Sequence, residues 1–136
     1  MTALQAFAEN LFLVEGPNVR DMGILFTTRM TIVTLSNGSL WVDSPVPVPF
    51  DTLQRITQLG PVRYLVAATP RHVWRLESWH TLFPDAQLWV PRPTLLTLKR
   101  GHLTITGILG DAPVGDWADD LDQVAFKGNP LGEEVI

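Results

Sequence analysis

The order of strand and helix signals between residues 40 and 90 restricts the fold of this 136-residue chain more than any other feature. Apolar runs predict strands at residues 40–42, 62–67 and 87–90, and apolar residues at helical spacing predict helices at 51–59 and 71–83. A helix between two such strands forms a crossover, and crossovers join parallel strands. We therefore expect an α/β (α+β) domain with a parallel or mixed sheet and flanking helices.

Antiparallel strands are expected ahead of this segment. Residues 30–35 alternate between apolar and β-branched side chains, and Asn37-Gly38 then supplies the positive φ angles of a tight hairpin turn. A further strand is expected at 11–14. The alternating prolines of residues 45–49 predict an extended loop, because proline fixes φ and removes a backbone donor.

The signals weaken after residue 100. We expect a helix at 93–100 and strands at 103–106, 121–126 and 133–136. The chain contains no internal repeat, low-complexity tract or linker. The elements are therefore expected to form one domain over residues 1–136.

Composition excludes several classes of site and partner. The chain has 14 acidic and 10 basic residues, a net charge of −4, so it lacks the basic excess typical of a nucleic-acid binder. It has no cysteine, which excludes disulfides, thiolate zinc sites, iron–sulfur clusters and cysteine nucleophiles. Residues 1–15 carry no Lys or Arg, and no window approaches the ~20 apolar residues that span a bilayer. We expect a cytoplasmic protein with neither a nucleic-acid nor a membrane partner.

Reactive side chains are sparse. The sequence has no glycine-rich phosphate loop and no G-x-S-x-G nucleophile motif. His72 and His80 would lie about 12 Å apart along one helix, which is too far to share a zinc ion. Glu77 with His80 predicts a surface pair, and a solvated loop is expected at Asp116, Asp119, Asp120 and Asp122. Core packing or a partner surface is expected for Trp41, Trp74, Trp79, Trp89 and Trp117.

Several motifs occur in a characteristic order along the chain. They are Leu40-Trp41-Val42-Asp43-Ser44, Gly60-Pro61-Val62-Arg63-Tyr64-Leu65-Val66-Ala67, Phe83-Pro84-Asp85-Ala86, and Gly128-Asn129 followed by Glu133-Glu134-Val135-Ile136. In this order they resemble an uncharacterised bacterial family of the metallo-β-lactamase fold, over most of the chain. The resemblance implies the N-terminal half of an αββα sandwich, in a chain that is short at its C-terminus relative to that family.

The resemblance also implies a degenerate metal site. Metallo-β-lactamases bind one or two metal ions with H-x-H-x-D-H in the turn after a strand. When the last histidine of this motif is placed on His72, the other positions fall on Ala67, Thr69 and Arg71. Alanine offers no lone pair and an arginine cation repels a metal ion, so we expect no metal and no other cofactor. Asp43 matches the strand-end aspartate of the family, which supports the site from behind.

These residues predict a non-catalytic protein of this fold that binds a small molecule or a protein partner. The candidate pocket comprises Asp43, Thr69, Arg71, His72 and Trp74, beyond the strand ends where open α/β sheets place their ligands. Arg71 beside His72 favours an anionic ligand, unless Arg71 is only a solvated residue near the start of a helix. No residue is expected to be catalytic.

Other functions remain open at this point. A metal-dependent hydrolase with a non-standard zinc or iron site would use His72 together with His102, Asp43 or a ligand from a second chain. An interaction domain would instead expose Trp74 or Trp117. The sheet face that the second half covers in the family would expose apolar surface here, so we also expect a homodimer or another protein to cover it.

Overall fold

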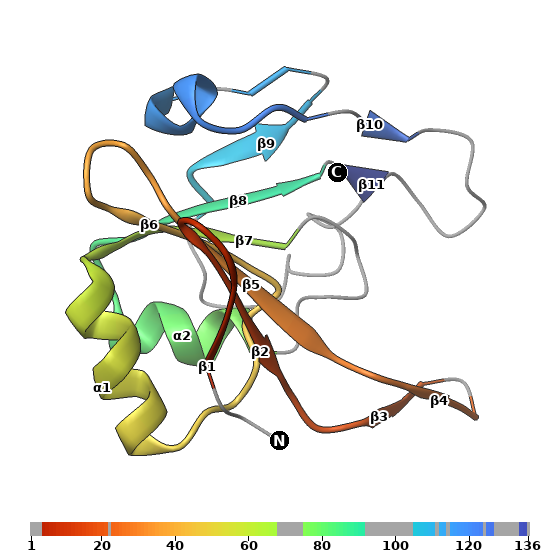
Figure 1. Ribbon diagram of the computed structural model, residues 1–136. Coiled ribbons are helices and arrows are strands. Elements are labelled where there is room, and N and C mark those ends of the chain that lie inside the picture. The colour runs from red at the N-terminus through yellow and green to blue at the C-terminus, as the bar shows by residue number, and fades with distance from the viewer. Residues whose placement is uncertain are drawn as a thin grey trace.

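The computed structural model describes residues 4–21, 23–67, 75–91, 105–110, 112–113, 115–123, 125–126 and 134–135. Within them, a mixed sheet of seven strands carries two α-helices on one face and a short 3₁₀ helix on the other (Figure 1). The strands, in their order across the sheet, are β1 (Leu4–Ala8), β2 (Leu11–Glu15), β5 (Arg29–Thr34), β6 (Leu40–Asp43), β7 (Val62–Val66), β8 (Gln87–Pro91) and β9 (Gly107–Leu109).

The sheet has an antiparallel part and a parallel part, as the sequence predicts. Neighbours from β1 to β6 are antiparallel, and neighbours from β6 to β9 are parallel. The turn between β5 and β6 is the expected one: Gly38 has a φ of 89°, and Asn37 Oδ1 accepts hydrogen bonds from the backbone N–H and the hydroxyl of Ser39 (2.9 and 2.6 Å). The predicted hairpin is therefore confirmed.

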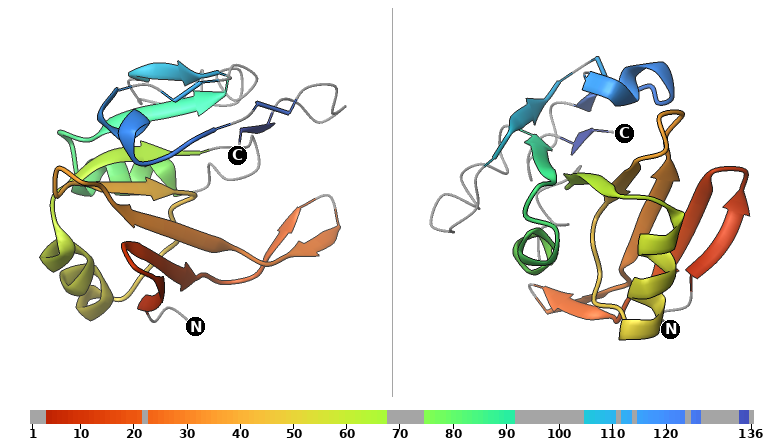
Figure 2. Two further views of the ribbon diagram at one scale, coloured as in Figure 1. Left: turned by 45° about the horizontal axis from the view of Figure 1, so that its top comes forward. Right: turned by 90° about the vertical axis from the view of Figure 1, so that its left-hand side faces the viewer.

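Two helices cover one face of the sheet, α1 (Phe50–Leu59) and α2 (Leu76–Leu82) (Figure 2). Asp51 lies in the first turn of α1, where a carboxylate interacts favourably with the helix dipole, and the helix ends at Gly60. The indole N–H of Trp79 in α2 donates to the carbonyl oxygen of Val46 (2.9 Å) and so anchors the proline-rich loop. Of the helix expected at 71–83, the structure gives 76–82, and residues 71–74 lie outside the described part.

The main core lies between these helices and the sheet. Its members are apolar side chains of α1 and α2 together with those that point to the helical face from β2, β5, β6, β7 and β8. The fully buried ones are Val14, Met30, Ile32, Leu40, Val42, Ile56, Leu65, Ala67, Leu76, Leu88 and Val90.

A second, smaller cluster lies on the opposite face, under the 3₁₀ helix η1 (Gly115–Asp119). Trp117 is only 1% exposed, and its ring meets Tyr64 and Trp89 edge to face at centroid distances of 4.8 and 5.1 Å. Its indole N–H donates to Gln123 Oε1 (3.2 Å), and the Gln123 amide donates in turn to the carbonyl oxygen of Gly110 (2.8 Å). The segment 115–123 thus closes the face over β7, β8 and β9.

Some sequence predictions were wrong or incomplete. The sequence did not predict β1, nor the hairpin of β3 (Val19–Asp21) and β4 (Ile24–Phe26). The strand expected at 121–126 forms only at β10 (Ala125–Phe126), which pairs with β11 (Glu134–Val135). Residue 121 instead stays with the end of η1, because the Leu121 N–H donates to the Trp117 carbonyl oxygen four residues earlier (2.8 Å).

Predictions for residues 93–106 are only partly covered by the described residues. The expected helix at 93–100 lies outside them, and so do residues 103 and 104. Residues 105–106 are irregular, and the strand of this region, β9, begins at Gly107. No helix among the described residues has the length and apolarity needed to cross a membrane.

Candidate functional site

Asp43 is the last residue of β6, at the edge of the sheet where the parallel strands have their carboxyl ends. Strand register places one row of residues across the sheet: Leu13 in β2, Thr31 in β5, Asp43 in β6 and Val66 in β7. Paired residues share a face, so Asp43 lies on the face of Val66, opposite the helices. The Asp43 side chain is half-buried between two neighbouring strands. It lies at the carboxyl ends of the strands, where open α/β sheets place their ligands.

The residue after Asp43 has an unusual backbone conformation. Ser44 is buried and has a φ of 58°, which is uncommon for a residue other than glycine. Its N–H donates to the carbonyl oxygen of Val66 (2.8 Å), so the chain stays tied to β7 while it turns into the proline-rich loop. Sterically unfavourable conformations of this kind cost of order 1 kcal/mol and cluster at functional sites.

Of the five residues predicted for the pocket, the structure places only Asp43. Thr69, Arg71, His72 and Trp74 lie in the segment 68–74, outside the described residues. The residue just before that segment is informative. Ala67 is fully buried within the main core, and its N–H donates to the carbonyl oxygen of Trp89 (3.2 Å).

A small cavity lies at the same edge of the sheet, at the root of the hairpin β3–β4. It has a volume of about 300 Å³ and is lined by Glu15, Gly16, Asn18, Thr27, Thr28 and Arg29. Strands β2 and β6 are both antiparallel to β5, so Glu15 at the end of β2 lies at the same edge as Asp43. Figure 1 shows the hairpin projecting from the body beyond this edge.

Polar contacts define the walls of this cavity. Arg29 Nη2 forms an ion pair with Glu15 Oε1 (2.8 Å), and the Thr28 hydroxyl donates to the carbonyl oxygen of Pro17 (2.6 Å). A Cβ at Gly16 would collide with Thr28 and Val46, so a close backbone approach requires glycine there. No local motif in the sequence marks these residues, although antiparallel pairing of the two expected strands places Glu15 opposite Arg29.

The described residues do not fit the metal site of metallo-β-lactamases. No three His, Cys, Asp or Glu side chains come together in the part of the chain that the structure describes. At the first ligand position of the H-x-H-x-D-H alignment, the Ala67 methyl group packs in the core and can donate no electron pair.

The structure also describes most of the other polar and aromatic residues that the sequence singles out. Glu77 is exposed and His80 half-buried on the surface of α2. Of the acidic run, Asp119, Asp120 and Asp122 are exposed, and Asp120 Oδ2 accepts hydrogen bonds from the Ser36 N–H and hydroxyl (3.1 and 3.0 Å). Trp117 is buried, which does not favour an interaction domain that exposes it.

Comparison with known proteins adds a family and a fold. Residues 19–96 match the family described as a domain of unknown function, DUF4336. No curated protein matches the chain.

Solved metallo-β-lactamases share the fold at low sequence identity. The DIM-1 enzyme superposes with a TM-score of 0.63 at 15% identity, over 97% of this chain and 62% of that one. The enzyme of Hirschia baltica superposes with a TM-score of 0.57 at 13% identity, over 82% of this chain and 53% of that one. The enzyme of Pontibacter korlensis superposes with a TM-score of 0.59 at 8% identity, over 93% of this chain and 60% of that one.

The chain therefore spans about three fifths of the length of these enzymes or slightly less. Identities this low show the fold alone. The expected fold, the N-terminal half of a metallo-β-lactamase-like sandwich with a mixed sheet and flanking helices, is confirmed.

Proposed function

Because the chain belongs to the DUF4336 family and folds like the first part of a metallo-β-lactamase, we propose that it is a non-catalytic binding protein of that fold. Its ligand is a small anionic molecule, bound at the edge of the sheet where β6 and β7 end. The protein holds this ligand by charge and hydrogen bonding, without a metal ion.

The burial of Ala67 is the observation that supports a protein without a metal ion. The Ala67 side chain is fully buried among core residues at the position where the metal motif begins. A histidine there would have to displace core side chains before it could reach a metal, and overpacking of this kind costs about 1–3 kcal/mol. The chain uses this position for packing.

The charge of the ligand follows from the sequence after β7. Arg71 and His72 are adjacent there, and arginine recognises carboxylates and phosphates by paired hydrogen bonds. In the described part of the chain, Arg29 supplies a guanidinium at the edge of the sheet where β6 ends, and Glu15 partly neutralises it. Asp43 and Glu15 disfavour a highly charged anion, so we expect a monoanion or dianion of metabolite size.

Metal content tests the non-catalytic part of the proposal. The purified chain, free of any tag, is incubated with zinc or ferrous iron, dialysed and measured by elemental mass spectrometry. We expect far less than one metal ion per chain. One or more bound ions per chain would contradict the proposal and favour a hydrolase with His72 and an unusual ligand set.

Anion binding tests the other part. Inorganic phosphate and succinate, both at most dianions, serve as probes in a thermal-shift titration of the whole chain at neutral pH. We expect a saturable rise in melting temperature that Arg71→Ala abolishes. The matched control is Arg55→Ala, which removes an exposed arginine from α1 and should leave the rise unchanged. An identical response of both variants would show that the effect is a general one of salt.

A further inference from the structure

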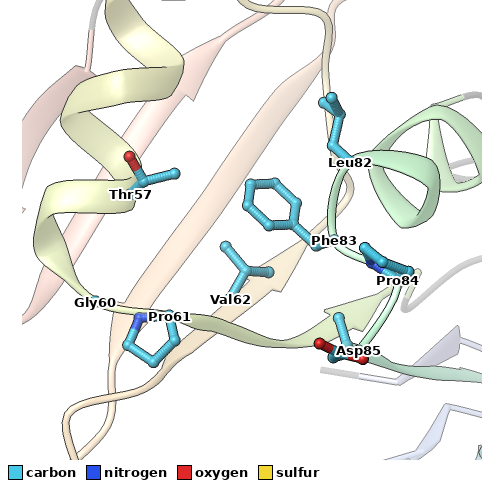
Figure 3. Close-up of a pocket in the computed structure, with 9 residues that line it drawn as sticks. Thr57, Gly60, Pro61, Val62, Leu82, Phe83, Pro84 and Asp85 are labelled. Carbon is cyan, nitrogen blue, oxygen red and sulfur yellow. The ribbon is translucent and has the colours of Figure 1, made fainter.

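A second cavity lies at the opposite edge of the sheet, where β7 and β8 begin. It has a volume of about 300 Å³ and lies between the ends of α1 and α2 (Figure 3). Its walls are formed by Thr57, Gly60, Pro61, Val62, Leu82, Phe83, Pro84, Asp85 and Ala86. This volume is at the lower end of the range for small-molecule sites.

The floor of the cavity is apolar and rigid. Figure 3 shows Val62 and Phe83 between the two helices, with Asp85 beside them at the start of the turn into β8. The Phe83 ring packs against Trp79 at a centroid distance of 5.7 Å, and Trp79 is held by its bond to Val46. Leu82 is 54% exposed at the rim, so its side chain is open to contact with a ligand.

The electrostatic environment of this cavity is negative. Both helices end at it, and a helix C-terminus carries a partial negative charge on its free carbonyl groups. Pro61 and Pro84 lie four residues after Thr57 and His80 and have no N–H, so these two carbonyl groups cannot accept the usual helical hydrogen bond. Asp85 adds an exposed carboxylate, and no lining residue is Lys or Arg.

We propose that this cavity binds a small organic cation, a protonated amine carried on an aromatic or aliphatic body. The ammonium group pairs with the Asp85 carboxylate and the helix-terminal carbonyl groups, and the face of the Phe83 ring adds a cation–π attraction. The body of the ligand covers Val62 and Leu82. The site is independent of the function proposed above, because it lies at the other edge of the sheet from Asp43.

The test is a titration of the whole isotope-labelled chain with 2-phenylethylamine, followed by backbone NMR shifts at neutral pH. Two probes of the same size serve as controls, neutral 2-phenylethanol and anionic phenylacetate. We expect the largest shifts at residues 57–62 and 82–86. The amine should bind at least fivefold more tightly than the alcohol, and phenylacetate should bind most weakly.

Two variants separate charge from packing. Asp85→Asn should lower the affinity for the amine about three- to fivefold, as expected for the loss of an exposed charge, and leave the affinity for the alcohol unchanged. Glu77→Gln removes another exposed carboxylate from α2, outside the cavity, and should change nothing. Equal affinity for amine and alcohol, no effect of Asp85→Asn, or shifts centred elsewhere would each overturn the proposal.

Discussion

At the residue scale, Asp120 gives the acidic run after Trp117 a structural role. Sequence alone predicts a solvated loop there, and the side chains are indeed exposed. Asp120 nevertheless joins segments 84 positions apart, because its Oδ2 accepts two hydrogen bonds from Ser36 at the hairpin turn. Together with buried Trp117, this contact holds η1 on the sheet.

Asp120→Ala should therefore reduce the free energy of unfolding by about 0.5–1 kcal/mol, the usual value of exposed hydrogen bonds to a charged acceptor. Urea unfolding followed by tryptophan fluorescence measures the change. Asp119→Ala is the control, since it removes an exposed carboxylate of the same segment that lacks these two bonds. Equal losses in both variants would show that the Ser36 contact contributes nothing.

At the scale of elements, the end of α1 packs tightly against the turn between β5 and β6. A Cβ at Gly60 would overlap the carbonyl oxygen of Gly38, which is a backbone atom and cannot move aside cheaply. The Leu40 N–H donates to the carbonyl oxygen of Pro61 (2.8 Å) beside this contact. Glycine at 60 thus lets the helix end come down onto the hairpin.

Gly60→Ala should lower the free energy of unfolding by about 2 kcal/mol or more, because the overlap forces the backbone apart. Gly110→Ala is the matched control, since a Cβ there meets nothing within 4 Å and the carbonyl group that Gln123 uses is retained. Chemical unfolding of both variants gives the comparison. A small effect of Gly60→Ala would mean that the two turns can move apart without loss of stability, which would contradict the prediction.

The strength of local sequence signals determines which elements can be predicted from the sequence. The β5–β6 hairpin, α1, β7 and β8 carry strong local signals: an Asn-Gly turn, a helical apolar face and apolar runs. Strand β1 does not, because Gln5-Ala6-Phe7-Ala8 has little strand preference and becomes a strand by pairing with β2. The cavity at Glu15 and Arg29 depends on the same kind of long-range pairing, and of the predicted pocket only Asp43 is described.

At the scale of the whole molecule, one part of the sheet is poorly covered. Strand β1 is at the edge, contains no charged residue, and presents Phe7 with 71% of its surface exposed. An uncharged edge strand with an exposed aromatic side chain favours pairing with a second polypeptide here.

We propose that a second copy of the chain pairs along β1, since a two-fold axis lets the same uncharged strand meet itself. Light scattering after size-exclusion chromatography should give a dimer mass, and Phe7→Lys should shift it toward the monomer. Leu25→Lys is the control, because Leu25 is 57% exposed in β4, which belongs to a separate two-stranded sheet. A monomer mass for the unaltered chain would contradict the proposal.

The late position of Trp117 in the chain also matters during synthesis. Leu35, Tyr64 and Val66 leave the ribosome long before Trp117, which covers them. Local hairpins such as β5–β6 form quickly, whereas parallel strands wait for distant partners. Until Trp117 emerges, an apolar face of the nascent chain stays open to solvent.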